Sequence, residues 1–407
     1  MTRPANSRGS FGLHARHPLS HIGPQRSVYF SLRPSDRETV FTSRIFVPAS
    51  SAKRVLVAPL DWGLGHATRC IPVIRALQDR GATVFIGGAG PHLSLLSREF
   101  PSLEVVPLAN YGITYATSPL LLALKFPFMV AQVVRRSQRE HAELDAVINE
   151  HRIDAVISDQ RFGCYSRRVK SVYITHQLCV KMPAAFSILE RLVARALRFA
   201  ANRFDQTWIP DFPGDDNLTG DLTRKYPLPR NHRFVGPLSR FGAGESVTEK
   251  TPLDLLVMLS GPEPQRTLLE QRMLAQLRDY QGRAVVLLGR PEAETLAGIR
   301  DNIQILPHVP SEKIEQLMRT AHTIVCRGGY TTIMELVSLG RSAVLVPTPG
   351  QTEQEYLCKR LAKKGWFASV QQNELEMQKL PDSADLNHGF QCLGNALMIA
   401  ALTTMVD

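Results

Sequence analysis

The sequence predicts an α/β fold made of two successive doubly wound parallel sheets, and three observations support this prediction. Short runs rich in Val, Ile and Leu alternate with longer amphipathic segments between residues 54 and 366. A glycine-bearing loop follows the first apolar run of each half. A polar segment, residues 239–252, separates the two halves. Because strands that alternate with helices pair in parallel, each half should form a sheet with helices on both faces.

The composition is that of a globular protein with hydrophobic cores. Of the 407 residues, 44% are hydrophobic and 21% are charged, and a chain of this length usually forms two domains. The formal net charge is +11, of which residues 1–52 contribute +5. The remaining positive charge suits an anionic partner, such as a nucleoside diphosphate or an acidic lipid surface. The sequence has no basic stripe interleaved with aromatic residues, so nucleic acid is not expected as a partner.

Residues 1–52 form a basic N-terminal extension for which the sequence predicts disorder. Arg, Ser, Pro and His dominate this segment, and it has no hydrophobic period. Two other interpretations remain open: that the natural start codon lies further downstream, or that the Arg-rich, acid-poor segment is an organelle transit peptide. The first 30 residues lack the apolar region of a secretory signal.

The expected location is the cytoplasm, and peripheral contact with the inner face of a membrane is an alternative that the sequence leaves open. The longest apolar run, residues 119–134, is interrupted by Lys125 and Pro127 and is shorter than the ~20 residues that a membrane helix needs. Six cysteines are scattered without a CxxC pair, which favours reduced thiols over disulfides or a zinc site.

The first domain is expected to span residues 53–238. Its first unit is a strand at 54–59, a glycine-bearing loop, a helix at 67–81 and a strand at 82–88. Further strands are expected at 103–106, 153–157, 172–174 and 206–209, and helices at 184–202 and at 119–150, the latter broken at Pro127.

The linker, 239–252, leads to a second domain at residues 253–384, followed by a C-terminal helix within 385–407. Strands are expected at 253–259, 283–289, 303–305, 322–326 and 342–347, and helices at 265–280, 311–319, 330–339 and 353–364. Since open parallel sheets bind ligands at the carboxyl ends of their strands, a cleft between the domains is the expected ligand site.

The most informative segment is CRGGYTTIMELVSLGRSAVLVPTPGQTEQEYL, residues 326–357. Gly328 and Gly329 follow a strand and open a helix, whose free backbone N–H groups can bind a diphosphate. Glu335 lies one turn further on, where its carboxylate can accept hydrogen bonds from both hydroxyls of a ribose. A Pro-bearing turn and a second helix start follow, with polar side chains that can reach a sugar.

This segment resembles the donor-binding segment of glycosyltransferase family 28, which includes bacterial lipid-linked N-acetylglucosaminyltransferases and plant galactolipid synthases. The family pattern runs Gly-Gly, Thr or Ser, Glu-Leu, a Pro-bearing loop and a Gln pair. The matching residues, in order, are Gly328, Gly329, Thr332, Glu335, Leu336, Pro347 and Gln354. Glu355 stands where the family has its second Gln. The resemblance covers roughly residues 54–366.

The resemblance implies the GT-B fold, in which two Rossmann-like domains face a cleft, with acceptor on the first domain and donor on the second. It further implies that Glu335 binds the ribose of a UDP-sugar and that Gln354 binds its sugar. The full set of expected donor-binding residues is Ser260, Gly261, Arg327, Gly328, Gly329, Thr331, Thr332, Glu335, Gln354 and Glu355.

A second loop, DWGLGH at residues 61–66, lies between the first strand and first helix. It resembles the family's N-terminal Gly-rich loop, which also ends in Gly-His, although Leu64 replaces one glycine. Gly63 and Gly65 are expected to form an acceptor or phosphate loop. His66 titrates near neutral pH and can take a proton from an acceptor hydroxyl, or it can simply cap the helix.

Two further positions have alternative interpretations. Asp159 follows a predicted strand, where it can orient His66, bind acceptor or be a solvated turn residue. Ser260 and Gly261 follow the first strand of the second domain, where they contact donor phosphates or form a plain turn. The prolines beside them, Pro262 and Pro264, depart from the family pattern because they lack N–H donors.

Two apolar stretches with basic fringes, residues 119–136 and 182–203, have a similar choice. Each can rest on an anionic lipid surface or pack its apolar face against the protein core. The second interpretation, a core-packed helix with a solvated basic face, is the ordinary one.

The predicted function is an inverting, metal-independent transfer of a hexose or N-acetylhexosamine from a UDP-sugar to an acceptor hydroxyl, with His66 and Asp159 as catalytic residues. No cofactor is expected, because the UDP-sugar is a co-substrate, and no DxD pair stands at a strand end. Two alternatives need the same donor site: a nucleotide-sugar hydrolase or epimerase, and a non-catalytic nucleotide-sugar-binding protein.

Overall fold

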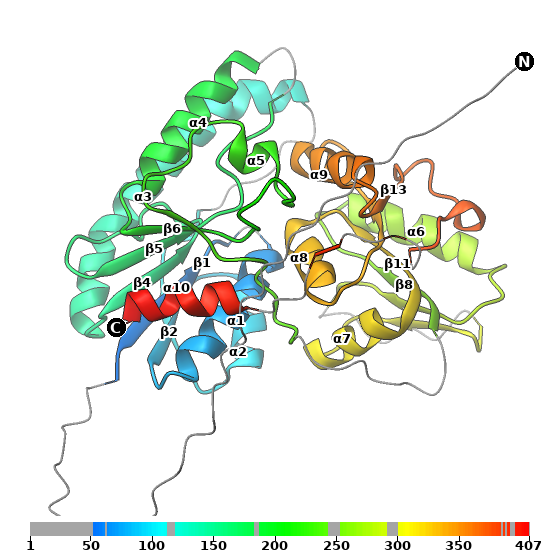
Figure 1. Cartoon of the computed structure of the whole chain (residues 1–407), viewed down its shortest axis with the longest axis horizontal. Helices are drawn as coiled ribbons and strands as arrows, with labels where there is room; N and C mark the ends of the chain where they lie inside the picture. Colours follow the sequence, from blue (N-terminus) through cyan, green and yellow to red (C-terminus); the bar gives the residue numbers. More distant parts are fainter. Residues whose placement is uncertain are drawn as a thin grey trace, which may run out of the picture. The chain divides into compact units, whose positions relative to one another are not determined.

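A computed structural model gives the structure of the chain (Figure 1). The residues that it describes are 52–61, 63–111, 119–182, 187–242, 253–290, 300–383, 386, 389–390 and 395–406. The chain divides into two units, residues 1–49 and 50–407, and the second is described here. Residues 1–51 of the predicted N-terminal extension and residues 243–252 of the predicted linker lie outside the described residues.

The first sheet is parallel throughout and has the strand order β3-β2-β1-β4-β5-β6-β7. Val, Ile and Leu fill its central strands, which are buried on both faces, as the prediction of a covered parallel sheet requires. The strands are β1 Arg54–Pro59, β2 Thr83–Gly88, β3 Glu104–Pro107, β4 Ala155–Asp159, β5 Lys170–Ile174, β6 Gln206–Ile209 and β7 His232–Phe234.

The second sheet repeats this order with six strands, β10-β9-β8-β11-β12-β13, and it is also parallel. The strands are β8 Leu253–Met258, β9 Ala284–Leu287, β10 Ile303–Leu306, β11 Ala321–Arg327, β12 Val344–Val346 and β13 Ala368–Ser369. The prediction of two Rossmann-like, doubly wound domains is therefore confirmed.

The strand order reverses direction at one place in each sheet, between β1 and β4 and between β8 and β11. Connections leave such a switch point toward opposite faces, so the loops after the two strands diverge and leave room for a ligand. The segment 61–66 follows β1, and Asp159 is the last residue of β4. The loop 259–264 follows β8, and Gly328 follows β11. Both predicted glycine-bearing loops thus lie at switch points.

Helices connect the strands of both sheets. Those of the first half are α1 Leu64–Gln78, α2 Pro91–Glu99, α3 Pro119–Glu150, α4 Ser187–Ala201 and α5 Asp221–Arg224. Those of the second half are α6 Gln265–Leu277, α7 Ser311–Thr320, α8 Tyr330–Ser338 and α9 Thr352–Lys363, followed by a short 3-10 helix, Met377–Lys379, and α10 Ala396–Val406.

Two helix predictions were wrong in detail. The helix expected to break at Pro127 runs without interruption from Pro119 to Glu150. A proline removes one backbone hydrogen bond but has a φ angle that a helix accepts, so a long helix can continue through it. Helix α1 begins at Leu64 instead of residue 67. Gly63, at φ 108°, turns the chain immediately before Leu64 and so allows the helix to begin there.

The C-terminal helix α10 packs against the first half of the chain, although it follows the second half in sequence. In Figure 1 the red α10 lies beside the blue α1. Arg80, two residues after α1, donates to the Ile399 carbonyl and to Thr403, and Arg233 of β7 donates to Thr404. The chain therefore returns to its first domain at the end.

A single hydrophobic cluster joins the two halves. It contains Trp208 and Leu238 from the first half, Tyr330 and Met334 of α8, and Met398 of α10. All five side chains are buried. No helix among the described residues is long and apolar enough to span a membrane.

Replacement of Gly328 by Ala is expected to destabilise the fold. A Cβ there would lie 2.2 Å from Sγ of Cys358 on α9, so the Cys358 side chain or the backbone around Gly328 must shift. Overpacking of this kind costs about 1–3 kcal/mol in the free energy of unfolding, measured by urea titration.

Gly329→Ala is the matched control, because a Cβ at Gly329 meets nothing within 4 Å. Cys358→Ala in the Gly328→Ala background removes the clashing sulfur and should recover part of the loss. An unfolding free energy unchanged by Gly328→Ala would contradict this account of the packing.

Candidate functional site

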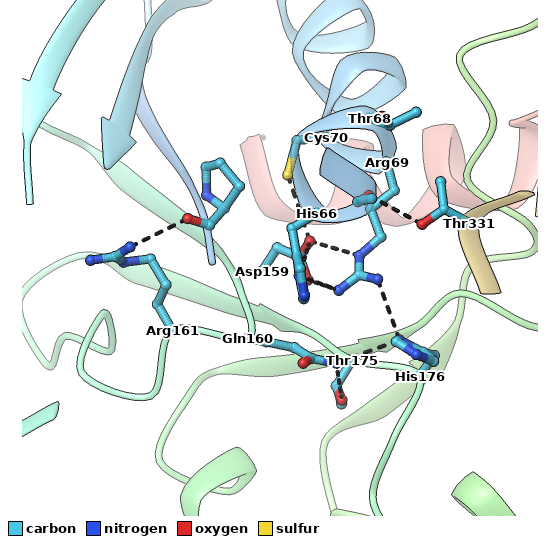
Figure 2. Close-up of polar contacts among 12 residues, drawn as sticks. His66, Thr68, Arg69, Cys70, Asp159, Gln160, Arg161, Thr175, His176 and Thr331 are labelled. Carbon is cyan, nitrogen blue, oxygen red and sulfur yellow. Dashed lines mark hydrogen bonds and ion pairs between the residues drawn. The ribbon is translucent and has the colours of Figure 1, made fainter. Parts of the chain in front are cut away.

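The site in the first half lies where β4 ends and α1 begins. Asp159 is the last residue of β4 and is fully buried. His66 is the third residue of α1, and its Nδ1 lies 3.2 Å from Oδ2 of Asp159. The structure thus brings together the two residues that the sequence predicted as catalytic. Figure 2 shows them facing each other with Arg69 beside them.

Arg69 binds Asp159 through two hydrogen bonds. Its Nε donates to Oδ2 and its Nη2 donates to Oδ1, each at 2.6 Å. Arg69 is 2% exposed and Asp159 is 0% exposed, so both charges are buried and compensate each other. Burial alone would raise the pKa of Asp159, but Arg69 and His66 hold it below its ordinary value. Asp159 is therefore a carboxylate at neutral pH.

Arg69 also contacts His66. Its Nη2 lies 2.6 Å from Nδ1 of the imidazole. Burial lowers the pKa of His66, and the charge of Arg69 lowers it further, although Asp159 acts in the opposite direction. His66 is therefore neutral at neutral pH, as a residue that accepts a proton must be.

A second histidine joins the group from the segment after β5. Nδ1 of His176 lies 3.4 Å from Nη1 of Arg69, and its Nε2 lies 3.0 Å from Oε1 of Glu353 at the start of α9. The imidazole stacks on Tyr330 with ring centroids 4.4 Å apart. Since Tyr330 and Glu353 belong to the second half, His176 links the two halves at the site.

One face of α9 extends these contacts between the two halves. Side chains one turn apart bind the first half, whereas Leu357 and Leu361 pack into the core. The contacts run from Thr352 Oγ1 to the Lys181 carbonyl at 3.1 Å, from the Asp221 N–H to Tyr356 Oη at 2.7 Å, from Arg360 to the Asn217 carbonyl at 3.1 Å and from Lys364 to Asp216 at 3.0 Å.

The Gly-Gly helix start of the second half lies against the loop of the first. Thr331 Oγ1 donates to the carbonyl of Gly65 at 3.1 Å, and a Cβ at Gly65 would lie 3.0 Å from that hydroxyl. Gly65 therefore permits a close approach of α1 to α8. Gly329 is the N-cap of α8, and no side chain caps the helix. Thr332 is the third residue of α8.

Glu335, expected to bind a ribose, is 3% exposed and is paired with Arg240. Nε of Arg240 donates to its Oε1 at 2.8 Å, and Nη1 of Arg240 donates to Ser311 at 3.1 Å. Burial raises the pKa of Glu335, and Arg240 opposes this shift. The hydrogen bond from Arg240 is made to Oε1 of the carboxylate.

The two side chains expected at the donor sugar both bind the loop before α9. Oε1 of Gln354 accepts from the N–H of Thr348 at 2.9 Å, and Oε1 of Glu355 accepts from the N–H of Gly350 at 2.9 Å. In this structure, their oxygens shape the loop 347–351.

Arg327 joins the two loops that the sequence assigned to the donor. Its Nη2 donates to the Gln265 carbonyl at 2.7 Å, and its Nη1 donates to the Pro347 carbonyl at 3.3 Å. Burial lowers its pKa to about 10. Arg327 thereby ties the start of α6 to the turn after β12.

Ser260 and Gly261 lie in the exposed part of the loop after β8. Gly261 has φ 104°, and a Cβ placed there would be 3.6 Å from Thr348 Oγ1. Several buried polar side-chain atoms in this region have no hydrogen-bond partner among the described residues. They are Arg327 Nε, Thr348 Oγ1, Gln351 Oε1 and Gln372 Oε1.

The sequence analysis missed Arg69, His176 and Glu353. Arg69 lies three residues after His66, a spacing that puts both side chains on one face of a helix, but this signal exists only once α1 is known to begin at Leu64. His176 and Glu353 are 177 positions apart, and no local pattern relates them.

The described residues contain no group of three or more His, Cys, Asp or Glu side chains arranged to hold a metal ion. Five cysteines, Cys70, Cys164, Cys179, Cys326 and Cys358, are free and buried. Cys392 lies outside the described residues.

Comparison with known families places the second half. Residues 289–387 match the glycosyltransferase family 28 C-terminal domain. This segment contains β11, α8, β12 and α9, which carry most of the expected donor-binding residues.

Two relatives match most of the chain. An uncharacterized glycosyltransferase of Methanosarcina acetivorans is 23% identical over 77% of this chain and 84% of its own length. A UDP-N-acetylglucosamine–N-acetylmuramyl-(pentapeptide) pyrophosphoryl-undecaprenol N-acetylglucosamine transferase of Histophilus somni is 23% identical over 81% of this chain and 88% of its own.

Solved structures share the fold. The glycosyltransferase SnogD of Streptomyces nogalater superposes with a TM-score of 0.54 at 14% identity, covering 87% of this chain and 94% of that one. MurG of Acinetobacter baumannii superposes with a TM-score of 0.51 at 15% identity, covering 87% of this chain and 100% of that one. These similarities confirm the two-domain GT-B fold.

Asp159→Asn is expected to destabilise the protein by about 3–5 kcal/mol, because it leaves the buried charge of Arg69 without its partner. Because the folded-state pKa of Asp159 is lowered, its contribution is complete above the ordinary Asp value of about 3.9 and is lost as the pH falls through the folded value. The unfolding free energy of the variant, measured by urea titration, should accordingly depend less on pH in that range.

Asp145→Asn, at a surface carboxylate, is the control and should change little. The double variant Arg69→Met/Asp159→Asn should lose less than the sum of the two single losses. Strictly additive losses would mean that the two side chains do not interact.

Proposed function

We propose that this chain, a family 28 glycosyltransferase with the GT-B fold, transfers a hexose or N-acetylhexosamine from a UDP-sugar to an acceptor hydroxyl with inversion at the anomeric carbon. The observation that carries the proposal is the contact between Thr331 and Gly65. It sets the helix start of the family's donor segment next to the loop that bears His66.

On the donor side, the support comes from groups suited to a nucleoside diphosphate. The uncapped N-terminus of α8 offers backbone N–H groups to the diphosphate, without a metal ion in this proposal. Glu335 Oε2 would accept from the ribose. The unpartnered polar atoms Thr348 Oγ1 and Gln351 Oε1 would bind sugar hydroxyls, together with the amide Nε2 of Gln354.

On the acceptor side, the proposed base is His66. Its Nε2 has no partner among the described residues, and the ring is neutral. For Nε2 to take the proton of the attacking hydroxyl, the ring proton must be on Nδ1, where Asp159 can accept it at 3.2 Å. Asp159 would then stabilise the imidazolium that forms as the acceptor oxygen attacks the anomeric carbon and the diphosphate leaves.

We also propose that α3 and α4 contact an anionic membrane. Exposed apolar side chains on these helices include Phe128 at 78% and Phe199 at 70% exposure. Arg135 and Arg191 on the same helices are also exposed. Apolar side chains fringed by arginines suit the interface of an acidic bilayer. The remaining side chains at 119–127 and 183–188 lie outside the described ones.

Nucleotide binding tests the donor site. UDP at about 100 times its dissociation constant should stabilise the protein by about 2.7 kcal/mol in a thermal-shift assay, and GDP and dTDP should do so less. Glu335→Ala should weaken UDP binding about 10–100-fold, the worth of a charge-assisted hydrogen bond. Glu312→Ala, at an exposed position of α7, is the control. A larger shift with GDP, or unchanged UDP binding by Glu335→Ala, would remove the donor assignment.

Turnover tests the base. His66→Ala should lower kcat about 10²–10⁴-fold and leave UDP affinity nearly unchanged, because a general base acts only as the hydroxyl loses its proton. The products of a UDP-sugar and acceptor screen are analysed together: a glycoside supports transfer, whereas free sugar or an epimer alone would indicate hydrolysis or epimerisation. Near-normal turnover by His66→Ala would exclude the proposed base.

Membrane contact is tested by sedimentation with vesicles. The protein should sediment with vesicles containing phosphatidylglycerol and less with pure phosphatidylcholine. Phe128→Ser/Phe199→Ser should reduce binding several-fold, while Leu268→Ser, at an exposed apolar position of α6, should not. Equal sedimentation of both variants would contradict the assignment of α3 and α4.

A further inference from the structure

Arg69 places its hydrogen atoms in a way that restricts His66. A guanidinium is always protonated and has only donors to offer. The Nη2 atom of Arg69 carries two hydrogens and has two partners, Asp159 Oδ1 at 2.6 Å and His66 Nδ1 at 2.6 Å. Nδ1 of His66 must therefore accept the hydrogen bond from Nη2. The proton of the neutral His66 ring then lies on Nε2.

The second histidine obeys the same rule. Nδ1 of His176 faces two donors, Nη1 of Arg69 and Nε2 of Gln160, each at 3.4 Å. Nε2 of His176 faces the carboxylate of Glu353 at 3.0 Å, which can only accept from it. His176 therefore also carries its proton on Nε2. Figure 2 shows the guanidinium of Arg69 between the two imidazoles.

This arrangement opposes the proton position that general-base catalysis needs. A His66 that takes a proton on Nε2 must carry its ring proton on Nδ1, toward Asp159 Oδ2 at 3.2 Å. Arg69 and Asp159 thus compete for the same ring nitrogen, and in this structure the shorter contact is that of Arg69.

We propose that Arg69 is a positioning residue that decides which ring nitrogen of His66 carries the proton. While Arg69 donates to Nδ1, His66 presents an N–H at Nε2 and is only a hydrogen-bond donor. When the guanidinium turns away from Nδ1, that nitrogen takes a proton from water and Nε2 gives one to water, so the ring stays neutral. Nε2 can then accept the hydroxyl proton. The catalytic consequence rests on the proposed function, whereas the proton position does not.

Charged and titratable groups from four parts of the described chain surround His66. Arg69 and Cys70 come from α1, Asp159 from β4, His176 from the segment after β5 and Glu353 from α9. Of these, Arg69 opposes a positive charge on His66 and Asp159 favours one. Removal of Arg69 should therefore raise the pKa of His66 and move the acid limb of the turnover profile to higher pH.

The test reads the proton position directly by NMR. The full chain is labelled with 15N-histidine, and long-range proton–nitrogen spectra are recorded at a pH where His66 is neutral. His66→Gln and His176→Gln identify the two sets of signals. In the unaltered protein we expect an unprotonated Nδ1 and a protonated Nε2 for both rings. In Arg69→Met we expect the proton of His66 on Nδ1.

Arg80→Met is the matched control, because it removes the same charge two residues after the end of α1, where the hydrogen bonds of Arg80 go to Ala76 of α1 and to Ile399 and Thr403 of α10. It should leave both rings as they are. A proton on Nδ1 of His66 in the unaltered protein, or an unchanged His66 in Arg69→Met, would overturn the proposal. If Arg69→Met does not fold, the unaltered protein still decides, and Arg69→Lys, which keeps the charge without the fork, serves as the second variant.

The experiment needs neither donor nor acceptor, so it separates this proposal from the function. The expected proton positions together with an absence of UDP binding would leave the role of Arg69 standing and remove the glycosyl-transfer proposal. Where turnover is measurable, the acid limb of the kcat profile should move to higher pH in Arg69→Met and stay in place in Arg80→Met. An acid limb that stays in place in Arg69→Met would remove the catalytic role assigned to Arg69.

Discussion

The buried ion pair between Arg69 and Asp159 is the interaction on which the first half of the site depends. An isolated carboxylate at the end of β4 would be costly to bury, and so would an isolated guanidinium on α1. Together they fix the first turn of α1 against the sheet at its switch point. The same guanidinium that holds Asp159 also reaches the ring of His66, whose pKa is lowered first by burial and then by the charge of Arg69.

The second half is coupled to this pair through α9. Glu353 binds His176, which in turn faces Arg69, and the other contacts of α9 follow on the same face of the helix. The opposite face carries Gln354, whose oxygen holds the loop before α9. A ligand that changes this loop would therefore act on a helix that also touches the histidine cluster. The proposed donor and acceptor sides are thus connected through a single helix, α9.

The helices, the strands and the family resemblance of the segment 326–357 were largely predictable because their signals are local. Apolar runs, glycines and helix starts predicted two doubly wound sheets, and the order Gly328, Gly329, Glu335 pointed to the family whose C-terminal domain matches residues 289–387. The start of α1 was placed three residues too late, since the φ of Gly63 is not visible in the sequence. That error hid the helical relation of His66 to Arg69, and with it the central ion pair.

The sequence by itself determined the alternation of strands and helices, the two glycine-bearing loops and the polar residues of the segment 326–357. These features depend on residues near one another in the chain. Only the tertiary structure decided the partners of the charged side chains. Glu335 meets Arg240, Glu353 meets His176, and Asp159 meets both Arg69 and His66 across 90 or more positions. Electrostatic pairing in a buried site depends on distance in space, and no periodicity in the sequence encodes it.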